Sequence, residues 1–189
     1  MRLFLASESP RRRELLKNLI ADFEVESAEV CELGADCALS PEAIVAHNAA
    51  IKAEAVALKH PDAWVLGADT VVAMDGRVYG KPRNMAEAKE FLRSFSGRSH
   101  SVLTAVALRC GAAGEKVDFI SCSQVVFQKL SEDVIAEYLR LVPVLDKAGA
   151  YAIQEYGDML VESVTGELEN VIGLPVAALR EQLVNIGII

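Results

Sequence analysis

Residues 64–74 read WVLGADTVVAM, and this stretch decides the fold. A long apolar run bounded by turn residues predicts a largely buried strand. Asp75 and Gly76 follow it and favour a two-residue hairpin turn into a short strand at Val78 and Tyr79. A hairpin joins antiparallel strands, so a sheet built around this segment is mixed.

Upstream of this strand, the sequence predicts a strand and two helices. Residues 2–6 form a short apolar run that predicts a first strand. Ser9 as N-cap and Pro10 at the first helical position open a helix whose buried face we expect to be Leu15, Leu16 and Leu19.

The second helix is predicted from Glu42 to about Lys59, after the start signal Ser40-Pro41. Apolar residues at helical spacing mark its expected buried face: Ile44, Ile51, Ala55 and Leu58.

Downstream, helices and strands continue to alternate. Asn84 and Glu87 form a capping-box pattern that opens a helix closed by Gly97. Strands are predicted over 101–108 and 117–130, joined by a glycine-containing turn at 111–114, and over 161–164. Further helices are predicted over 132–141, stopped near Pro143, and from Pro175 onward. The predicted fold class is α/β, with a mixed twisted central sheet flanked by helices.

The bulk composition is that of one ordinary globular domain spanning residues 1–189. Hydrophobic residues make up 52% of the chain and charged residues 24%. No apolar run approaches the roughly 20 residues that span a bilayer, and the apolar residues 3–6 run directly into polar and basic residues, unlike a signal peptide. We therefore expect a cytoplasmic protein without a membrane partner.

The cysteines and histidines give no sign of a zinc site. The four cysteines show no C-x-x-C spacing, and the three histidines form no local cluster with them. Scattered reduced thiols are the expected state in a cytosolic protein.

The formal net charge of −8 argues against a nucleic-acid partner, because such a partner usually requires a basic face. A small polyanion will approach an acidic protein where positive charge is concentrated locally or a divalent cation intervenes.

Three consecutive arginines, Arg11 to Arg13, occupy the first turn of the first predicted helix. The helix dipole is positive there and normally favours acidic side chains. A bound phosphate would remove the conflict, held by free backbone N–H groups, the hydroxyls of Ser7 and Ser9, and a guanidinium. A solvated basic patch is the alternative. The segment is not a Walker A loop, because its glycines and Lys-Ser/Thr pair are missing.

Asp69 is a carboxylate inside the apolar run, where it requires a hydrogen bond, an ion pair or a metal. Its alternative role is to cap a local backbone turn. Lys52 and Gln154 stand within small or apolar stretches, and Lys81 lies on the stiff Gly80–Pro82 loop. Taken singly, each of these three is more often a solvated or internally satisfied side chain.

Six stretches in this order resemble the Maf-like family of nucleotide pyrophosphatases, which are related in fold to the inosine-triphosphate pyrophosphatases. The resemblance covers essentially the whole chain. Its stretches are LASESPRR (5–12), GADTVV (67–72), GKP (80–82), SGR (96–98) with His100 and Thr104, DKAGAYAIQ (146–154) and NVIGLP (170–175).

The resemblance implies roles for particular residues. Asp69 matches the general base or the residue that positions the attacking water. Residues matching the phosphate-binding and other substrate-binding positions are Ser7, Arg11, Arg12, Lys52, Thr70, Lys81 and Gln154. Of these, Arg12, Thr70 and Gln154 match positions associated with substrate choice.

The resemblance also implies a divalent cation, Mg²⁺ or Mn²⁺, held by Glu32 and Asp69 and completed by substrate oxygens, as Mg²⁺ commonly is. The family often carries a second acid just before the first of these, where this sequence has Cys31. A homodimer is a further implication of the resemblance.

The GADT and AYAIQ stretches look like the branch acting on dTTP and UTP, which releases pyrophosphate and leaves the monophosphate, a house-cleaning activity on the nucleotide pool. The branch acting on 7-methyl-GTP usually has a serine before the aspartate. Two alternatives remain. One is a purine-type enzyme acting on inosine triphosphate or 7-methyl-GTP. The other is a nucleotide-binding regulator of septum formation without significant turnover.

Overall fold

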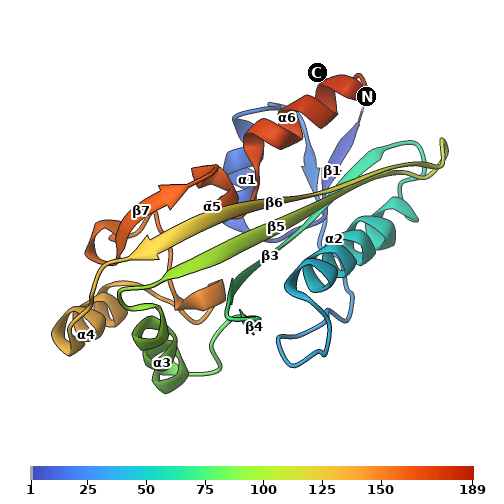
Figure 1. Cartoon of the computed structure of the whole chain (residues 1–189). Coiled ribbons are helices and arrows are strands. Elements are labelled where there is room, and N and C mark those ends of the chain that lie inside the picture. Colours follow the sequence, from blue (N-terminus) through green and yellow to red (C-terminus); the bar gives the residue numbers. More distant parts are fainter. Residues whose placement is uncertain (1) are drawn as a thin grey trace.

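The computed structural model describes residues 2–189, which form one seven-stranded mixed sheet flanked by helices (Figure 1). The strand order is β2-β1-β3-β5-β6-β7, and β4 pairs with β3 off this path. The strands are β1 (Leu3–Leu5), β2 (Glu24–Val25), β3 (Trp64–Met74), β4 (Arg77–Tyr79), β5 (Ser99–Cys110), β6 (Glu115–Phe127) and β7 (Val161–Thr165).

The helices are α1 (Pro10–Lys17), α2 (Pro41–Ala57), α3 (Met85–Phe95), α4 (Glu132–Leu141), α5 (Leu168–Ile172) and α6 (Val176–Asn185), with short 3-10 turns η1 (Ala148–Ala150) and η2 (Gly157–Met159). Side chains of Ser9, Ser40 and Asn84 cap α1, α2 and α3 as predicted. Among residues 2–189, no helix combines the length and apolar character that crossing a bilayer requires.

The predicted central strand is confirmed, and it organises the sheet. β1 runs parallel to β3, whereas β4 and β5 are antiparallel to it. Asp75 and Gly76 both have positive φ, 53° and 74°, as a type I′ hairpin turn requires. The sheet is therefore mixed, as predicted from the hairpin turn at Asp75 and Gly76.

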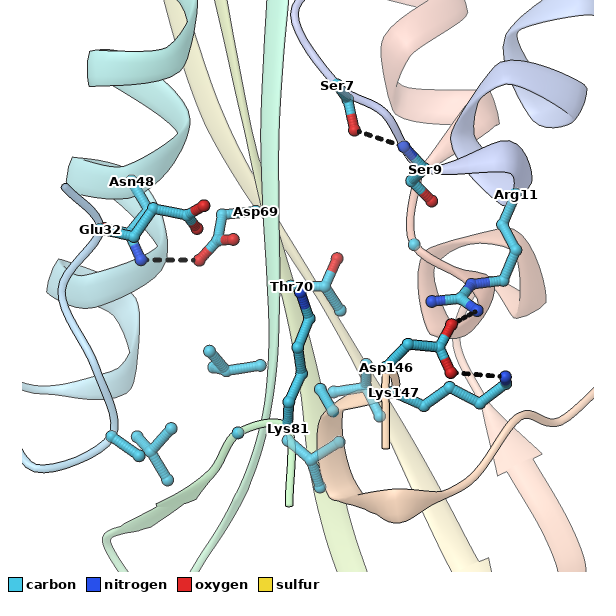
Figure 2. Close-up of a pocket in the computed structure, with 18 of the residues that line it drawn as sticks. Ser7, Ser9, Arg11, Glu32, Asn48, Asp69, Thr70, Lys81, Asp146 and Lys147 are labelled. Atoms are coloured by element: carbon cyan, nitrogen blue, oxygen red, sulfur yellow. Dashed lines mark hydrogen bonds and ion pairs between the residues drawn. The ribbon is translucent and has the colours of Figure 1, made fainter. Parts of the chain in front are cut away.

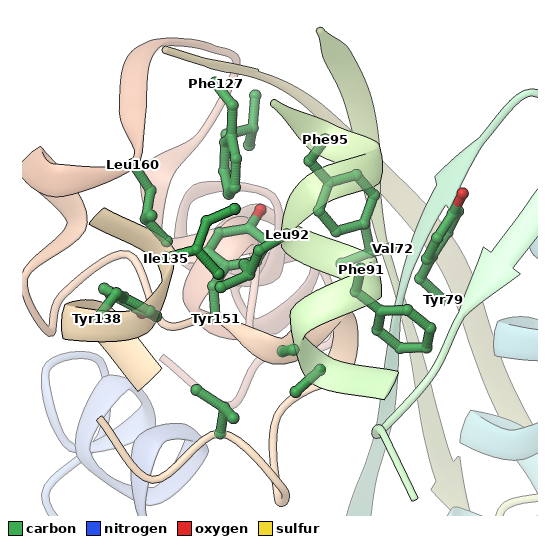
Figure 3. Close-up of a cluster of buried hydrophobic side chains, with 14 of the residues drawn as sticks. Val72, Tyr79, Phe91, Leu92, Phe95, Phe127, Ile135, Tyr138, Tyr151 and Leu160 are labelled. Atoms are coloured by element: carbon green, nitrogen blue, oxygen red, sulfur yellow. The ribbon is translucent and has the colours of Figure 1, made fainter. Parts of the chain in front are cut away.

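Alternate residues of β3 enter different cores because side chains alternate across a strand. Val65, Val71 and Ala73 pack in the cluster beneath α2. On the other face, Leu66 and Ala68 join the α1 and α6 core, and residues further along join a third core between α3 and α4 (Figure 3). The ring of Tyr151 lies within this third core.

The buried face of α2 differs from the predicted one. Leu58 is 85% exposed, and Ile51 and Ala55 are only half-buried. The residues that face the sheet include the small side chains Ala49 and Ala53 together with Asn48 and Lys52. The prediction is confirmed for Ile44, which is buried. It was wrong for the other three residues because it assigned burial by hydrophobicity, whereas the close approach of this helix to the sheet selects small residues.

Several element boundaries also differ from the predictions. β5 begins two residues earlier and ends two later, β6 ends at Phe127 instead of Leu130, and α6 begins after Pro175, which is its N-cap. The short elements β2 and α5 were not predicted. Two and five residues carry too little periodicity to be recognised in a sequence.

Gly67 sets how closely α2 lies against β3. A Cβ atom at this position would lie 2.3 Å from the carbonyl oxygen of Ala49 and 2.7 Å from the backbone nitrogen of Ala53. Both atoms belong to the backbone of α2, so neither can move without displacing the helix.

Replacing Gly67 with alanine is expected to destabilise the protein by about 1–3 kcal/mol, the usual cost of overpacking. The measurement is the urea midpoint followed by circular dichroism. Gly80→Ala is the control, because a Cβ there meets only the Cβ of Ala35, at 3.8 Å. Equal stability losses in the two variants would contradict this account of Gly67.

His100 is a buried, uncharged group on β5. It is 2% exposed, its Nε2 lies 2.8 Å from the Tyr151 hydroxyl, and the rings of Phe95 and Phe127 pack against it. Burial lowers the pKa of His100 from 6.5 to about 4, because desolvation penalises the imidazolium.

The unfolded chain therefore binds a proton at His100 below pH 6.5 that the folded chain does not bind until about pH 4. This contribution to stability is complete above pH 6.5 and is lost as the pH falls towards 4, by up to about 3 kcal/mol. In His100→Gln the unfolding free energy should fall less steeply over that interval in urea titrations. If the unfolding free energy of the variant falls with pH as steeply as that of the native protein, His100 does not cause the loss of stability.

Candidate functional site

An interruption along one edge of β3 creates the site. β1 pairs with residues 64–66 of β3, and β4 pairs with residues 72–74. In the described chain, residues 67–71 therefore have no strand beside them on this edge. A cavity of about 1070 Å³ opens along it, large enough for a nucleotide-sized ligand. Side chains from both faces of β3 reach the cavity, Asp69 from the α2 face and Thr70 from the other.

Asp69 is held by two side chains of α2. Asn48 donates a hydrogen bond from Nδ2 to Oδ2 of Asp69 at 3.0 Å, and Lys52 donates from Nζ to Oδ1 at 2.9 Å. Asn48 and Lys52 are four residues apart, so they lie on the same face of the helix. The carboxylate is 8% exposed and paired, and capping of a local turn, the alternative for Asp69, is wrong.

Glu32 reaches the same cluster from a loop. Its Oε2 lies 2.5 Å from Nζ of Lys52. Asn48 anchors this loop, since its Oδ1 accepts from the N–H of Leu33 at 2.8 Å and its Nδ2 donates to the carbonyl of Leu33 at 3.0 Å. Figure 2 shows Glu32, Asn48 and Asp69 gathered beside β3. One ammonium group thus bridges the two carboxylates to which the family resemblance assigned a metal.

Arg12 is enclosed at the opposite wall, beyond β3. Its guanidinium donates to the carbonyl of Gly173 at 2.9 Å, to Oγ1 of Thr70 at 3.0 Å and to Oγ of Ser7 at 3.4 Å. Desolvation by burial lowers the pKa of Arg12, and the carboxylates of Asp69 and Glu32 oppose that effect. The solvated-patch alternative is therefore wrong for Arg12, whereas Arg13 is exposed.

Arg11 and the segment after α4 form the next part of the wall. Nη1 of Arg11 lies 3.5 Å from Oδ2 of Asp146, and the other oxygen of Asp146 accepts from Nζ of Lys147 at 2.9 Å (Figure 2). Lys147 is buried, and its Nζ also donates to the carbonyl of Pro143 at 2.5 Å. This arrangement leaves Arg11 only weakly neutralised at the rim of the cavity.

Lys81 and Gln154 are exposed residues that line the cavity. The side chain of Lys81 runs along β3 in the direction of Thr70 (Figure 2), and it has no ion-pair partner within residues 2–189. A hydrogen bond from the N–H of Gly149 to the carbonyl of Gly80 at 3.1 Å joins the two loops that carry these residues.

All of the residues assigned to the site from the sequence line this one cavity: Ser7, Arg11, Arg12, Glu32, Lys52, Asp69, Thr70, Lys81 and Gln154. Sequence reasoning gave no role to Asn48 or Asp146. The signal for Asn48 was present, because it lies one helical turn before Lys52. Asp146 pairs with a residue 135 positions away, and no local pattern indicates such a pairing.

The donors present suit a cation that takes only part of its ligands from the protein. Among residues 2–189, no group of three or more His, Cys, Asp or Glu side chains could hold a metal ion. Glu32 and Asp69 nevertheless both contact the ammonium of Lys52, so their carboxylates already converge on one positive charge. Two carboxylates supplemented by phosphate oxygens are a usual environment for Mg²⁺.

The cavity also has a different charge balance from the rest of the molecule. Its lining includes seven basic side chains, Arg11, Arg12, Lys52, Arg77, Lys81, Arg83 and Lys147, and six acidic ones, Glu8, Glu32, Asp36, Asp69, Glu87 and Asp146. The chain as a whole carries −8. The lining therefore lacks the negative excess of the rest of the molecule, and a polyanion meets less repulsion there.

Known proteins have similar sequences over nearly their whole length. The chain is 44% identical to the dTTP/UTP pyrophosphatase of Akkermansia muciniphila over 185 residues, covering 98% of this chain and 96% of that protein. It is 39% identical to the protein of the same name from Clostridioides difficile over 183 residues, covering 97% of this chain and 94% of that protein.

Solved structures support the fold at lower identity. The Ham1 protein of Staphylococcus aureus superposes with a TM-score of 0.56 at 15% identity, covering 98% of this chain and 100% of that one. A HAM1 protein from Coxiella burnetii gives 0.56 at 16% identity, covering 98% of each chain.

The family model described as Maf-like protein matches residues 2–186. Because that match spans almost the whole chain and agrees with the relatives above, this protein belongs to the Maf-like family.

Proposed function

We propose that this chain is a nucleoside triphosphate pyrophosphatase that hydrolyses dTTP and UTP to the monophosphate and pyrophosphate. The observation that carries the proposal is the Asp69–Lys52–Glu32 cluster at the uncovered edge of β3, inside a cavity that concentrates basic side chains. The names of the relatives that match over nearly the whole chain support the substrate.

Asp69 is the catalytic group in this proposal. Its carboxylate orients a water molecule and accepts a proton as the water oxygen attacks the α-phosphorus. The bond from the α-phosphorus to the bridging oxygen then breaks, and pyrophosphate leaves with that oxygen. Asn48 and Lys52 hold both oxygens of Asp69, so the carboxylate needs little reorganisation during the reaction.

The remaining side chains bind and orient the triphosphate. Lys81 and Arg11 provide positive charge for the leaving pyrophosphate, and Lys52 can share its three N–H donors between Asp69 and a phosphate oxygen. Ser7 lies beside the N-terminus of α1, where backbone N–H groups favour an anion. A Mg²⁺ or Mn²⁺ ion held by Glu32 and Asp69 would neutralise phosphate charge.

The base is recognised at the wall formed by Arg12, Thr70 and Gln154. Thr70 and Arg12 are linked by a hydrogen bond and face the cavity from the side of β3 opposite to Asp69. The same proposal includes a homodimer that acts in the cytoplasm in house-cleaning of the nucleotide pool, as the family resemblance implies.

In a pyrophosphate-release assay with Mg²⁺ or Mn²⁺, the protein should prefer dTTP and UTP over CTP, ATP, GTP, ITP and 7-methyl-GTP. Asp69→Asn should lower kcat by about 10²–10⁴, because the amide cannot accept the proton. Asp158→Asn, at an exposed carboxylate outside the cavity lining, is the matched control and should keep the native rate.

Other outcomes of this assay would redirect the assignment. Preferential cleavage of ITP or 7-methyl-GTP would indicate a purine-type enzyme. Nucleotide binding without pyrophosphate release under either metal would indicate a binding module. A near-native rate in Asp69→Asn would remove Asp69 from catalysis.

Lys81→Ala should weaken triphosphate binding at least about tenfold more than monophosphate binding, since the lost ammonium contacts the departing phosphates. Isothermal calorimetry with a non-hydrolysable dTTP analogue and with dTMP measures the two affinities. Lys17→Ala, at the exposed end of α1, should change neither. Equal losses for both ligands in Lys81→Ala would show that Lys81 is not a phosphate contact.

A further inference from the structure

A layer of buried polar side chains separates the two apolar cores on the Thr70 face of the sheet. Thr70 and Thr104 are directly opposite each other on β3 and β5. Thr104, Asn170 and Ser123 are at most 1% exposed. The hydroxyl groups of Thr104 and Ser123 and the side-chain N–H groups of Asn170 are hydrogen-bonded, whereas Oδ1 of Asn170 has no partner among residues 2–189. The hydroxyl partners determine which group donates and which accepts.

The direction of each hydrogen bond follows from Thr104. Its Oγ1 lies 3.1 Å from the backbone carbonyl of Asn170, which can only accept, so Thr104 donates its single hydrogen there. Oγ1 of Thr104 lies 2.9 Å from Oγ1 of Thr70. Because Thr104 has no second hydrogen, Thr70 must be the donor in that pair.

Thr70 then has no hydrogen left for the cavity. Nη2 of Arg12, which can only donate, occupies one lone pair of Thr70 Oγ1 at 3.0 Å. A hydroxyl oxygen has two lone pairs, so one acceptor position remains. Thr70 lines the cavity, and its hydroxyl therefore offers a ligand an acceptor and no donor.

We propose that Thr104 is a positioning residue that makes Thr70 an obligate hydrogen-bond acceptor, so that the cavity selects a base with an imide N–H. Uracil and thymine carry a hydrogen on the ring nitrogen between their two carbonyl groups. Cytosine presents an unprotonated acceptor nitrogen at that position, which would face the Thr70 oxygen without a hydrogen between them. The inference rests on the proposed function and names the feature of the base that its site reads.

The neighbouring donors fit the same pattern. A guanidinium has five N–H groups, and Arg12 uses three of them on Gly173, Thr70 and Ser7. The others are donors close to the Thr70 acceptor, and they suit the carbonyl groups that flank an imide N–H. A site built for one pattern of donors and acceptors discriminates strongly between bases, because a base with the wrong pattern leaves buried groups unpaired.

The test compares Thr104→Val with Thr104→Ser. Valine has the shape of threonine without the hydroxyl, so the hydrogen of Thr70 loses its acceptor and can turn into the cavity. In Thr104→Val, the ratio of kcat/KM for dTTP over dCTP should fall at least about tenfold, mainly through KM, because the base lies away from the reacting phosphorus. Serine restores the hydroxyl, so Thr104→Ser should keep the native ratio within about twofold.

Binding of dTMP and dCMP, measured by calorimetry, separates this inference from the proposed function. If the native protein releases no pyrophosphate from dTTP or UTP, the proposed function fails. A dTMP preference that Thr104→Val loses and Thr104→Ser keeps would still support the inference. If dTTP and UTP are hydrolysed but Thr104→Val keeps the native preference for thymine over cytosine, the inference is overturned and the function stands.

Folding of each variant is checked by circular dichroism, since Thr104→Val leaves the carbonyl of Asn170 without its donor. If that variant does not fold, Thr104→Cys takes its place, because a thiol is a poor acceptor for the Thr70 hydrogen. Loss of the thymine preference in Thr104→Cys supports the inference, and its retention overturns it. An equal loss in Thr104→Ser would also overturn it, because the hydroxyl alone is expected to restore the preference.

Discussion

Along one edge of β3, β1 pairs as far as Leu66 and β4 begins pairing at Val72, so the backbone between them faces a cavity instead of another strand. The long, apolar β3 can tolerate this interruption because β5 pairs with residues 64–73 on the other edge. Gly67, at the start of the uncovered stretch, lets α2 approach closely enough for its side chains to reach Asp69. The positions of Asp69, Asn48 and Lys52 follow from this local arrangement.

The ion pairs in the site show how an acidic protein can receive a polyanion. Burying Lys52 and Asp69 together avoids leaving either charge alone in a region of low dielectric constant, although such a pair adds little net stability. The ion pair instead holds the Asp69 carboxylate in a fixed position. The ammonium of Lys81 at the rim has no ion-pair partner in the part of the chain that the structure describes, and Arg11 is only weakly neutralised by Asp146. Long-range repulsion from a charge of −8 is thus countered at short range, where screening by salt is least effective.

Much of this architecture was predictable from the sequence, and the exceptions have physical causes. The central strand, its hairpin turn and the capped helices follow from local patterns, and the family resemblance assigned the anomalous charges at Arg12 and Asp69 to one site. The partners of these charges were not predictable, because Gly173 and Thr70 meet Arg12 across 161 and 58 residues of chain. The buried face of α2 was missed because small and polar residues occupy it. Which hydroxyl donates in the Thr70–Thr104 pair depends on a backbone carbonyl in α5, which only the folded chain brings there.

Asp69 and Thr70 are adjacent in the chain but point to opposite faces of β3, and different cores support them. Substitutions around Thr70 can therefore accumulate without disturbing the packing that orients Asp69, and the converse also holds. For an evolving lineage, this separation means that a change of preferred nucleotide does not require the hydrolytic apparatus to be rebuilt. A gene duplicate with this fold can diversify in what it recognises while it inherits its chemistry intact.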